Sequence, residues 1–135
     1  MRILALAVLV FGAGFAVPVQ AQAVNCSNAM TQMDINACAA ADFNAADAAL
    51  NAAYGQARDA MRRMDSGLPA HQAGAEIALR DAQRAWISFR DLACIAEGFQ
   101  MRGGSAEQML VVGCKARLTQ QRAQDLWTLA LGMQG

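Results

Sequence analysis

The four cysteines, Cys26, Cys38, Cys94 and Cys114, have the clearest covalent chemistry in this sequence. Cysteines either pair as disulfides or ligate a metal ion. None of their spacings is C-x-x-C, and the single histidine, His71, lies far from them in sequence. An even number of cysteines in a small exported chain is typical of a disulfide framework, so the sequence predicts two disulfides rather than a metal site.

A second group of side chains combines charge with hydrogen-bonding capacity. Its members are Asp47, Asn51, Tyr54, Arg84, Arg90 and Arg122. Two arrangements are open: a structural polar network that ties helices together, or a binding site in a groove. We expect the network, because buried charges are paired whether or not they do anything else, and arginine forms charge-assisted bonds with carboxylates.

The usual catalytic constellations are not apparent. The carboxylate pairs Asp42/Asp47 and Asp81/Asp91 have no histidine to complete a proton relay. No nucleophile stands in a recognisable elbow or triad order. We therefore expect a protein that is not an enzyme.

Methionine pairs provide one further alternative. Met30 and Met33, and likewise Met61 and Met64, are spaced so that two thioethers could bind copper(I), a soft ion. Methionine at such intervals more often fills a core. Copper binding is therefore the less favoured hypothesis, and no cofactor is predicted.

Three stretches have the apolar spacing of helices that would position these side chains; the third is described below with the turns. The first runs from a capping box at Thr31 and Asp34 to Met64, and the second from about Gln72 to Arg102. Their apolar residues alternate in steps of three and four, as in helical bundles. The first seam is Phe43, Ala46, Leu50, Ala53, Ala57, Ala60 and Met64. The second seam is Ala75, Leu79, Ala82, Trp86, Phe89, Ala93 and Ala96.

Within the second helix, the seam predicts that Trp86 and Phe89 are core residues. The polar residues of the same stretch are expected on the flanks and the opposite side. These are Gln83, Arg84, Ser88, Arg90 and Asp91.

Turn residues separate the helices. Asp65 to Pro69 is a break with glycine and proline close together, and Gly103-Gly104 ends the second helix. Ser105 to Gln108 resembles a second capping box that opens a third helix. That helix carries Leu110, Cys114, Leu118, Leu126, Leu129 and Met133 on roughly one side. The sequence has no alternating strand runs, so we predict an all-α fold, a small antiparallel three-helix bundle.

The first residues have the features of an export signal. Arg2 precedes an apolar run from Ile3 to Val17, Pro18 breaks it, and small residues lead to a cleavage point after Ala23. The run is short for a membrane span, which needs roughly 20 residues, although a retained anchor is the alternative. We expect a signal peptide over residues 1–23, a single domain over residues 24–135 and a periplasmic or secreted protein.

The expected mature chain has a nearly balanced charge. Cleavage after Ala23 would leave 112 residues, with ten basic against eleven acidic side chains. This balance, without a basic cluster or interleaved aromatics, argues against nucleic-acid binding. No later segment is apolar enough to span a membrane.

The helical hairpin predicts how the cysteines pair. Cys94 lies nine residues before the glycine pair, and Cys114 lies nine residues after the serine that follows it. Equal offsets in an antiparallel hairpin bring two residues to the same height. Cys38 lies at the same end of the bundle. Cys26 can fold back to it from the leader, which is the short segment of residues 22–30 before the first helix. We therefore expect the pairs Cys94–Cys114 and Cys26–Cys38.

Several motifs together resemble the LprI-like family of secreted proteins, whose named member inhibits lysozyme. The motifs are residues 33–38, Ala46-Asp47, Leu50-Asn51 with Tyr54, residues 82–91, Cys94, Gly103-Gly104-Ser105, Cys114, and Thr119 with Arg122. Two positions depart from the family pattern: Asp34 stands where glutamate is expected, and Phe89 where tyrosine is common. The resemblance implies a helical, disulfide-bonded exported domain with lysozyme inhibition as its candidate activity.

An inhibitor of this kind would block a sugar cleft that contains paired carboxylates. The turn Arg102, Gly103, Gly104 and Ser105, next to the Cys94–Cys114 pair, is the candidate inhibitor loop, with Arg102 and Ser105 as donors. An ordinary solvated turn is the alternative. The expected partner is a lysozyme or another envelope protein; a non-catalytic structural or interaction protein of the envelope is the alternative function. The sequence leaves the oligomeric state open.

Overall fold

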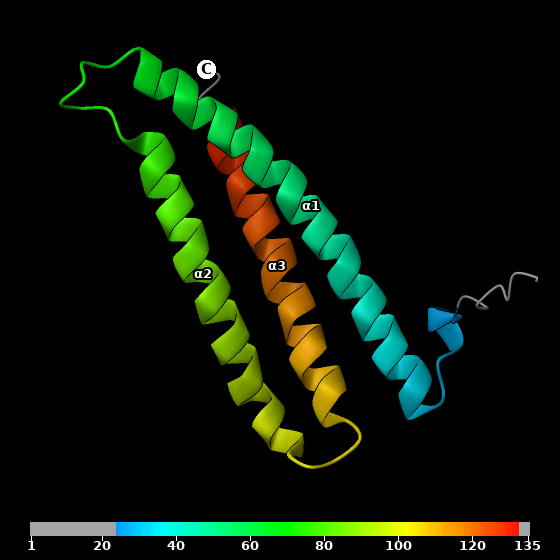
Figure 1. Ribbon diagram of the computed structural model, residues 1–135. Helices are drawn as coiled ribbons and strands as arrows, with labels where there is room; N and C mark the ends of the chain where they lie inside the picture. Colours follow the sequence, from blue (N-terminus) through cyan, green and yellow to red (C-terminus); the bar gives the residue numbers. More distant parts are fainter. Residues whose placement is uncertain (1–23, 133–135) are drawn as a thin grey trace, which may run out of the picture.

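The described residues of the protein form a bundle of three long helices (Figure 1). The computed structural model describes residues 24–132, and the predicted signal peptide, like Met133 of the third seam, lies outside them. Helix α1 spans Gln32–Ser66, α2 spans Ala75–Gly98 and α3 spans Glu107–Gly132. Two short 3₁₀ helices, η1 (Cys26–Asn28) and η2 (Phe99–Met101), complete the described elements. The predicted all-α, antiparallel bundle is confirmed. In the described part of the chain, none of the helices has both the length and the apolar composition of a membrane span.

Helix α1 begins where the capping box predicts. The Thr31 side chain accepts a hydrogen bond from the Asp34 N–H (3.1 Å), and its hydroxyl donates to the Asp34 carboxylate (2.7 Å). This reciprocal pair satisfies one of the N–H groups that a helix start leaves free.

The core lies along the predicted α1 seam. Leu50, Ala53 and Ala57 are buried there against Leu79 of α2. The α3 residues of this cluster are Ala123, Leu126 and Ala130. Small alanine side chains allow helices to approach closely, and α1 packs along α3 for much of its length in Figure 1. At the seam's ends the prediction is weaker, because Phe43 is only partly buried and Met64 is 42% exposed.

The predicted α2 seam is wrong over much of its length. The residues of α2 that are buried are Leu79, Gln83, Arg90, Cys94 and Gly98. Phe89 is 61% exposed, Ala82 and Ala96 are exposed, and Trp86 is only partly buried. The helix is therefore rotated relative to the prediction, with two polar side chains turned inward. Burial of these two side chains is possible because each forms a hydrogen bond with a side chain of α3.

Gly98 allows the closest approach between α2 and α3. A Cβ atom at this position would lie 2.4 Å from a methyl group of Val111. A larger residue would force Val111 or the helices to shift, so glycine suits the close packing of α2 against α3 at this point.

Both expected disulfides are present. Cys94 of α2 is bonded to Cys114 of α3, with their Cα atoms 5.4 Å apart. Cys26 in η1 is bonded to Cys38 of α1, with a Cα separation of 5.6 Å. The first bond joins two helices, whereas the second ties the leader to the start of α1.

Asp65 links the end of α1 to the start of α2. Its carboxylate accepts hydrogen bonds from the N–H groups of Gly74 and Ala75 (both 2.8 Å) and Glu76 (3.0 Å). Gly74, the residue before the helix, has φ +143°, a conformation that favours glycine. Helix α2 therefore begins at Ala75 rather than near Gln72, because the capping carboxylate comes from the preceding helix.

These bonds predict a pH-dependent contribution to stability. The backbone N–H donors of Glu76, Gly74 and Ala75 lower the pKa of the Asp65 carboxyl from its ordinary value of 3.8. A lowered folded-state pKa stabilises the fold above the unfolded-state pKa, and this stabilisation is lost as pH falls through the folded-state value. We expect Asp65→Ala to lower Tm by about 5 °C at neutral pH, as for a lost helix cap.

Thermal unfolding followed by circular dichroism between pH 2 and pH 7 measures this effect. The Tm difference between wild type and Asp65→Ala should be constant above about pH 5 and should shrink below it. Asp65→Asn is the control, because it keeps a capping oxygen without a titrating group. A Tm difference that does not change with pH would contradict this role of the carboxylate.

Candidate functional site

The turn between α2 and α3 is held by Glu107. Its carboxylate accepts hydrogen bonds from the Gly103 N–H (2.8 Å) and from Arg102 Nη1 (2.7 Å). The Gly103 N–H and then the Arg102 side chain lower the pKa of Glu107, so the carboxylate stays ionised. Gly103 has φ +78°, which favours glycine at this corner. The turn is thus fixed mainly by the first residue of the helix that follows it.

The candidate inhibitor loop, Arg102–Ser105, is exposed and shaped by three further contacts. The Arg102 guanidinium lies over the Phe99 ring, 4.7 Å from its centroid. The Gly104 N–H donates to the carbonyl of Met101 (2.9 Å). Asn36 of α1 donates to the carbonyl of Ser105 at 3.5 Å, so the loop also reaches the start of α1.

The sequence did not reveal the part played by Glu107. The capping box expected at Ser105 and Gln108 is wrong in register, because α3 begins at Glu107. The signal in the sequence is an acid three residues after a glycine pair, where its carboxylate can turn back to the glycine N–H. Arg102 is accordingly an exposed donor that already has one acidic partner.

A hollow of about 550 Å³ lies beside this loop. Its lining comes from the start of α1 (Asn36), from the loop and from the first turns of α3 up to Val111. The loop therefore has both a projecting side and a concave side.

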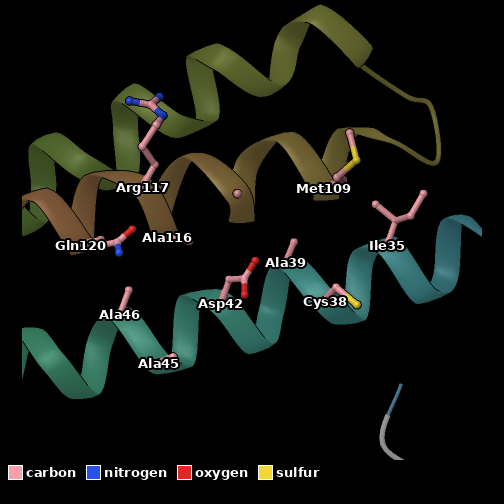
Figure 2. Close-up of a pocket in the computed structure, with 11 residues that line it drawn as sticks. Ile35, Cys38, Ala39, Asp42, Ala45, Ala46, Met109, Ala116, Arg117 and Gln120 are labelled. Atoms are coloured by element: carbon pink, nitrogen blue, oxygen red, sulfur yellow. The ribbon is translucent and has the colours of Figure 1, made fainter. Parts of the chain in front are cut away.

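A groove of about 710 Å³ lies between α1 and α3 (Figure 2). Ala39, Ala46 and Ala116 make it wide, because their short side chains leave space between the helices. Asp42 points into this space, whereas Arg117 points away toward α2, where it forms an ion pair with Glu97 (2.9 Å). The groove thus combines small apolar side chains with one exposed acid, and no motif in the sequence identified it.

Arg90 is the most highly connected member of the predicted polar network. It is only 8% exposed, and its guanidinium lies 5.3 Å from the ring centroids of both Phe43 and Trp86. Its Nη1 donates to the Thr119 hydroxyl (3.3 Å), and its Nη2 lies 2.9 Å from the Asp91 carboxylate. Arg90 therefore connects all three helices.

Asp91 takes part in this cluster from the surface. Burial raises its pKa, but the hydrogen bonds from Arg90 and Lys115 outweigh burial, and the pKa lies below 3.8. Lys115 Nζ is 3.2 Å from the same carboxylate oxygen, so the acid bridges α2 and α3.

The other expected network members lie in separate places. Arg122 donates to Gln83 (3.1 Å), and Asn51 donates to Asp47 within α1 (3.1 Å). Tyr54 and Arg84 line a groove of about 490 Å³ between α1 and α2. The structure therefore arranges the six residues as local contacts rather than as one continuous network.

The groove between α1 and α2 is predominantly basic. Arg58, Arg80 and Arg84 line it together with a single acid, Glu76, whose carboxylate is 3.3 Å from Arg58 Nε. Arg80 is paired with Asp81 outside the lining, at 2.9 Å. These are exposed ion pairs of the kind that contribute little to stability.

The two methionine pairs of the copper hypothesis lie at the surface or at the edge of the core. Met30 and Met33 are 88% and 77% exposed, so they do not fill the core as expected. Met61 packs against the core cluster, whereas Met64 is 42% exposed. Residues 24–132 contain no group of three or more histidine, cysteine, aspartate or glutamate side chains that could hold a metal ion.

Comparison with known proteins identifies relatives of this bundle. An uncharacterized protein of Rhizobium meliloti (strain 1021) is 50% identical over 105 residues, which is 76% of each chain. The crystal structure of a DUF1311 family protein from Pseudomonas putida KT2440 is similar, with a TM-score of 0.63 and 28% identity. The similarity covers 74% of this chain and 94% of that one. The family model described as "Lysozyme inhibitor LprI" matches residues 24–126, and the chain therefore belongs to the LprI family.

Proposed function

We propose that this protein is a non-catalytic, extracytoplasmic inhibitor that binds a lysozyme-type enzyme through the loop Arg102–Ser105. The observation that carries the proposal is the match of residues 24–126 to the lysozyme-inhibitor family. Two disulfides support an oxidising compartment outside the cytoplasm.

The geometry of the loop suits the blocking of a cleft. Binding is weakened when a flexible segment must be ordered, so a projection that is already fixed keeps more of its contact energy. The hydrogen bonds that Glu107 accepts from Arg102 and Gly103 fix this projection, and the Cys94–Cys114 bond joins the two helices that carry it.

The chemistry of the loop also suits a carboxylate target. A guanidinium has five N–H donors, and the bond from Arg102 to Glu107 uses one of them. Ser105 adds an exposed residue with a hydroxyl donor. Since lysozyme-type enzymes act through paired carboxylates in a sugar cleft, these donors can bind the acids that carry out the reaction.

The test is a titration of peptidoglycan lysis by several lysozyme types with the purified protein. We expect inhibition at stoichiometric amounts, without added metal. Ser105→Glu should weaken it at least about 10-fold, because it places a negative charge against the carboxylates of the enzyme.

Gln72→Glu is the matched control, since it adds the same charge in the turn at the opposite end of the bundle. It should inhibit like the wild type, and both variants should keep the wild-type helix content. Wild-type protein that inhibits none of the lysozymes would refute the proposed function. Equal weakening by both variants would refute the loop as the contact surface.

A further inference from the structure

A stripe of apolar residues faces outward along α2 and η2. The outer α2 stripe consists of Ala85, Phe89, Leu92, Ala96 and Phe99, all of them exposed. Its residues are spaced by alternating steps of four and three, the seam spacing of packed helices. It lies on the side of the helix away from the buried residues of α2. Part of the periodicity that predicted a core seam therefore belongs to a surface.

The stripe is large for a surface that contacts nothing. Phe89, Leu92 and Phe99 are 61%, 68% and 56% exposed, and Ile95 at its edge is 44% exposed. Together they present roughly 500 Å² of apolar surface, near the upper end of the patches that monomers tolerate. Two such surfaces, with their polar edges, bury on the order of 1,200 Å², the lower limit for a specific interface.

We propose that the outer α2 stripe is a homodimer interface, in which α2 packs antiparallel against α2 of a second copy about a twofold axis at Leu92. The order of residue sizes along the stripe fits this pairing. With Leu92 opposite its own copy, Phe99 faces Ala85, and Phe89 faces Ile95 and the adjacent Ala96 of the other chain. Each phenylalanine thus has an alanine of the other chain beside it, an arrangement that packs helices closely.

The charges at the ends of the stripe fit the same register. Asp81 lies about 16 Å from Leu92 along the helix in one direction, and Arg102 lies at a similar distance in the other. Their side chains are 56% and 62% exposed. In the antiparallel pair, Arg102 of each copy therefore lies next to Asp81 of the other, which places opposite charges at both ends.

The proposal is tested first by the mass of the exported protein in solution. Light scattering and sedimentation over about 1–200 µM should show a dimer with a dissociation constant in the micromolar range, as befits a small interface. Leu92→Glu should weaken the dimer about 100-fold or more, because it buries two like charges on the axis. Its helix content should stay unchanged, since Leu92 is mostly exposed within one chain.

The control is the same substitution elsewhere. Leu131→Glu alters a leucine of α3 that is 61% exposed and lies outside the stripe, and this variant should remain dimeric. A wild-type protein that is monomeric up to about 200 µM would overturn the proposal, even if another molecule binds the stripe. A dimer that survives Leu92→Glu would overturn it as well.

A charge exchange tests the register. Arg102→Asp and Asp81→Arg should each weaken the dimer about 10-fold, and the double variant should recover most of the loss. Within one chain the two residues are too far apart to contact, so recovery reports a contact between copies. Failure to recover would overturn the antiparallel register.

This inference does not rest on the inhibitor proposal. Leu92→Glu changes the mass of the protein without altering the loop, and Ser105→Glu alters the loop without touching the stripe. The two proposals share Arg102, but these two variants leave it unchanged and test the proposals separately.

Discussion

Removal of the Cys94–Cys114 disulfide is expected to lower the free energy of unfolding by about 3 kcal/mol, the value for a closed loop of some 20 residues. The bond links residues separated by 20 positions, and it joins α2 to α3 beneath the turn. Both cysteines are buried, at 0% and 3% exposure, so alanine is the suitable replacement. Denaturation of Cys94→Ala/Cys114→Ala by urea, compared with the wild type, measures the loss.

The second disulfide provides the control. Cys26–Cys38 closes a shorter loop, with a separation of 12 residues, and loop closure depends only weakly on loop length. However, Cys26 is exposed and η1 contributes no buried residue. The variant Cys26→Ser/Cys38→Ser should therefore release the leader and lose clearly less stability. Equal losses in the two double variants would show that the leader belongs to the cooperative core, contrary to this expectation.

The sequence predicts the fold correctly where the apolar periodicity of a helix matches the face that packs against the other helices. In α1, five of the six buried residues belong to the predicted seam, and the sixth, Ala39, precedes it. The five are Ala46, Leu50, Ala53, Ala57 and Ala60. The pairing of the cysteines followed from the position of the glycine turn, since an antiparallel hairpin fixes residue heights.

The face of α2 could not be predicted in the same way. Apolar periodicity assigns the inside of a helix by assuming that polar side chains face water. In α2 the inward residues Gln83 and Arg90 are polar and are satisfied by Arg122 and Thr119 of α3, which periodicity cannot detect. The apolar residues they displace, including Phe89 and Leu92, form the exposed stripe.

The candidate site was predictable only in its position. The glycine pair predicted the position of the turn. The hydrogen bond between Glu107 and the Gly103 N–H could not be predicted, because it depends on a backbone conformation that only the folded loop defines. Asp65 is similar, because it caps a helix that begins ten residues further along the chain. Such contacts depend on the path of the intervening loop and leave no periodic signal.

Arg90→Ala is expected to destabilise the protein by about 3 kcal/mol, through a lost buried side chain, two lost cation–π contacts and unpaired polar partners. Arg90 reaches Phe43 of α1, Trp86 of its own helix and Thr119 of α3, so its loss weakens the packing of the three helices at once.

Arg84→Ala is the matched control: the same change in the same helix, at a side chain that is 73% exposed, should cost at most about 0.5 kcal/mol. Arg90→Lys keeps the positive charge beside Asp91 but loses the planar group that lies over both rings, and should fall between the two alanine variants. Denaturant unfolding of the three proteins gives the order directly. Equal stability of Arg90→Ala and Arg84→Ala would contradict this expectation. The inward polar residues of α2 would then add no stability. Helix α2 would be held mainly by its disulfide and by the close packing at Gly98.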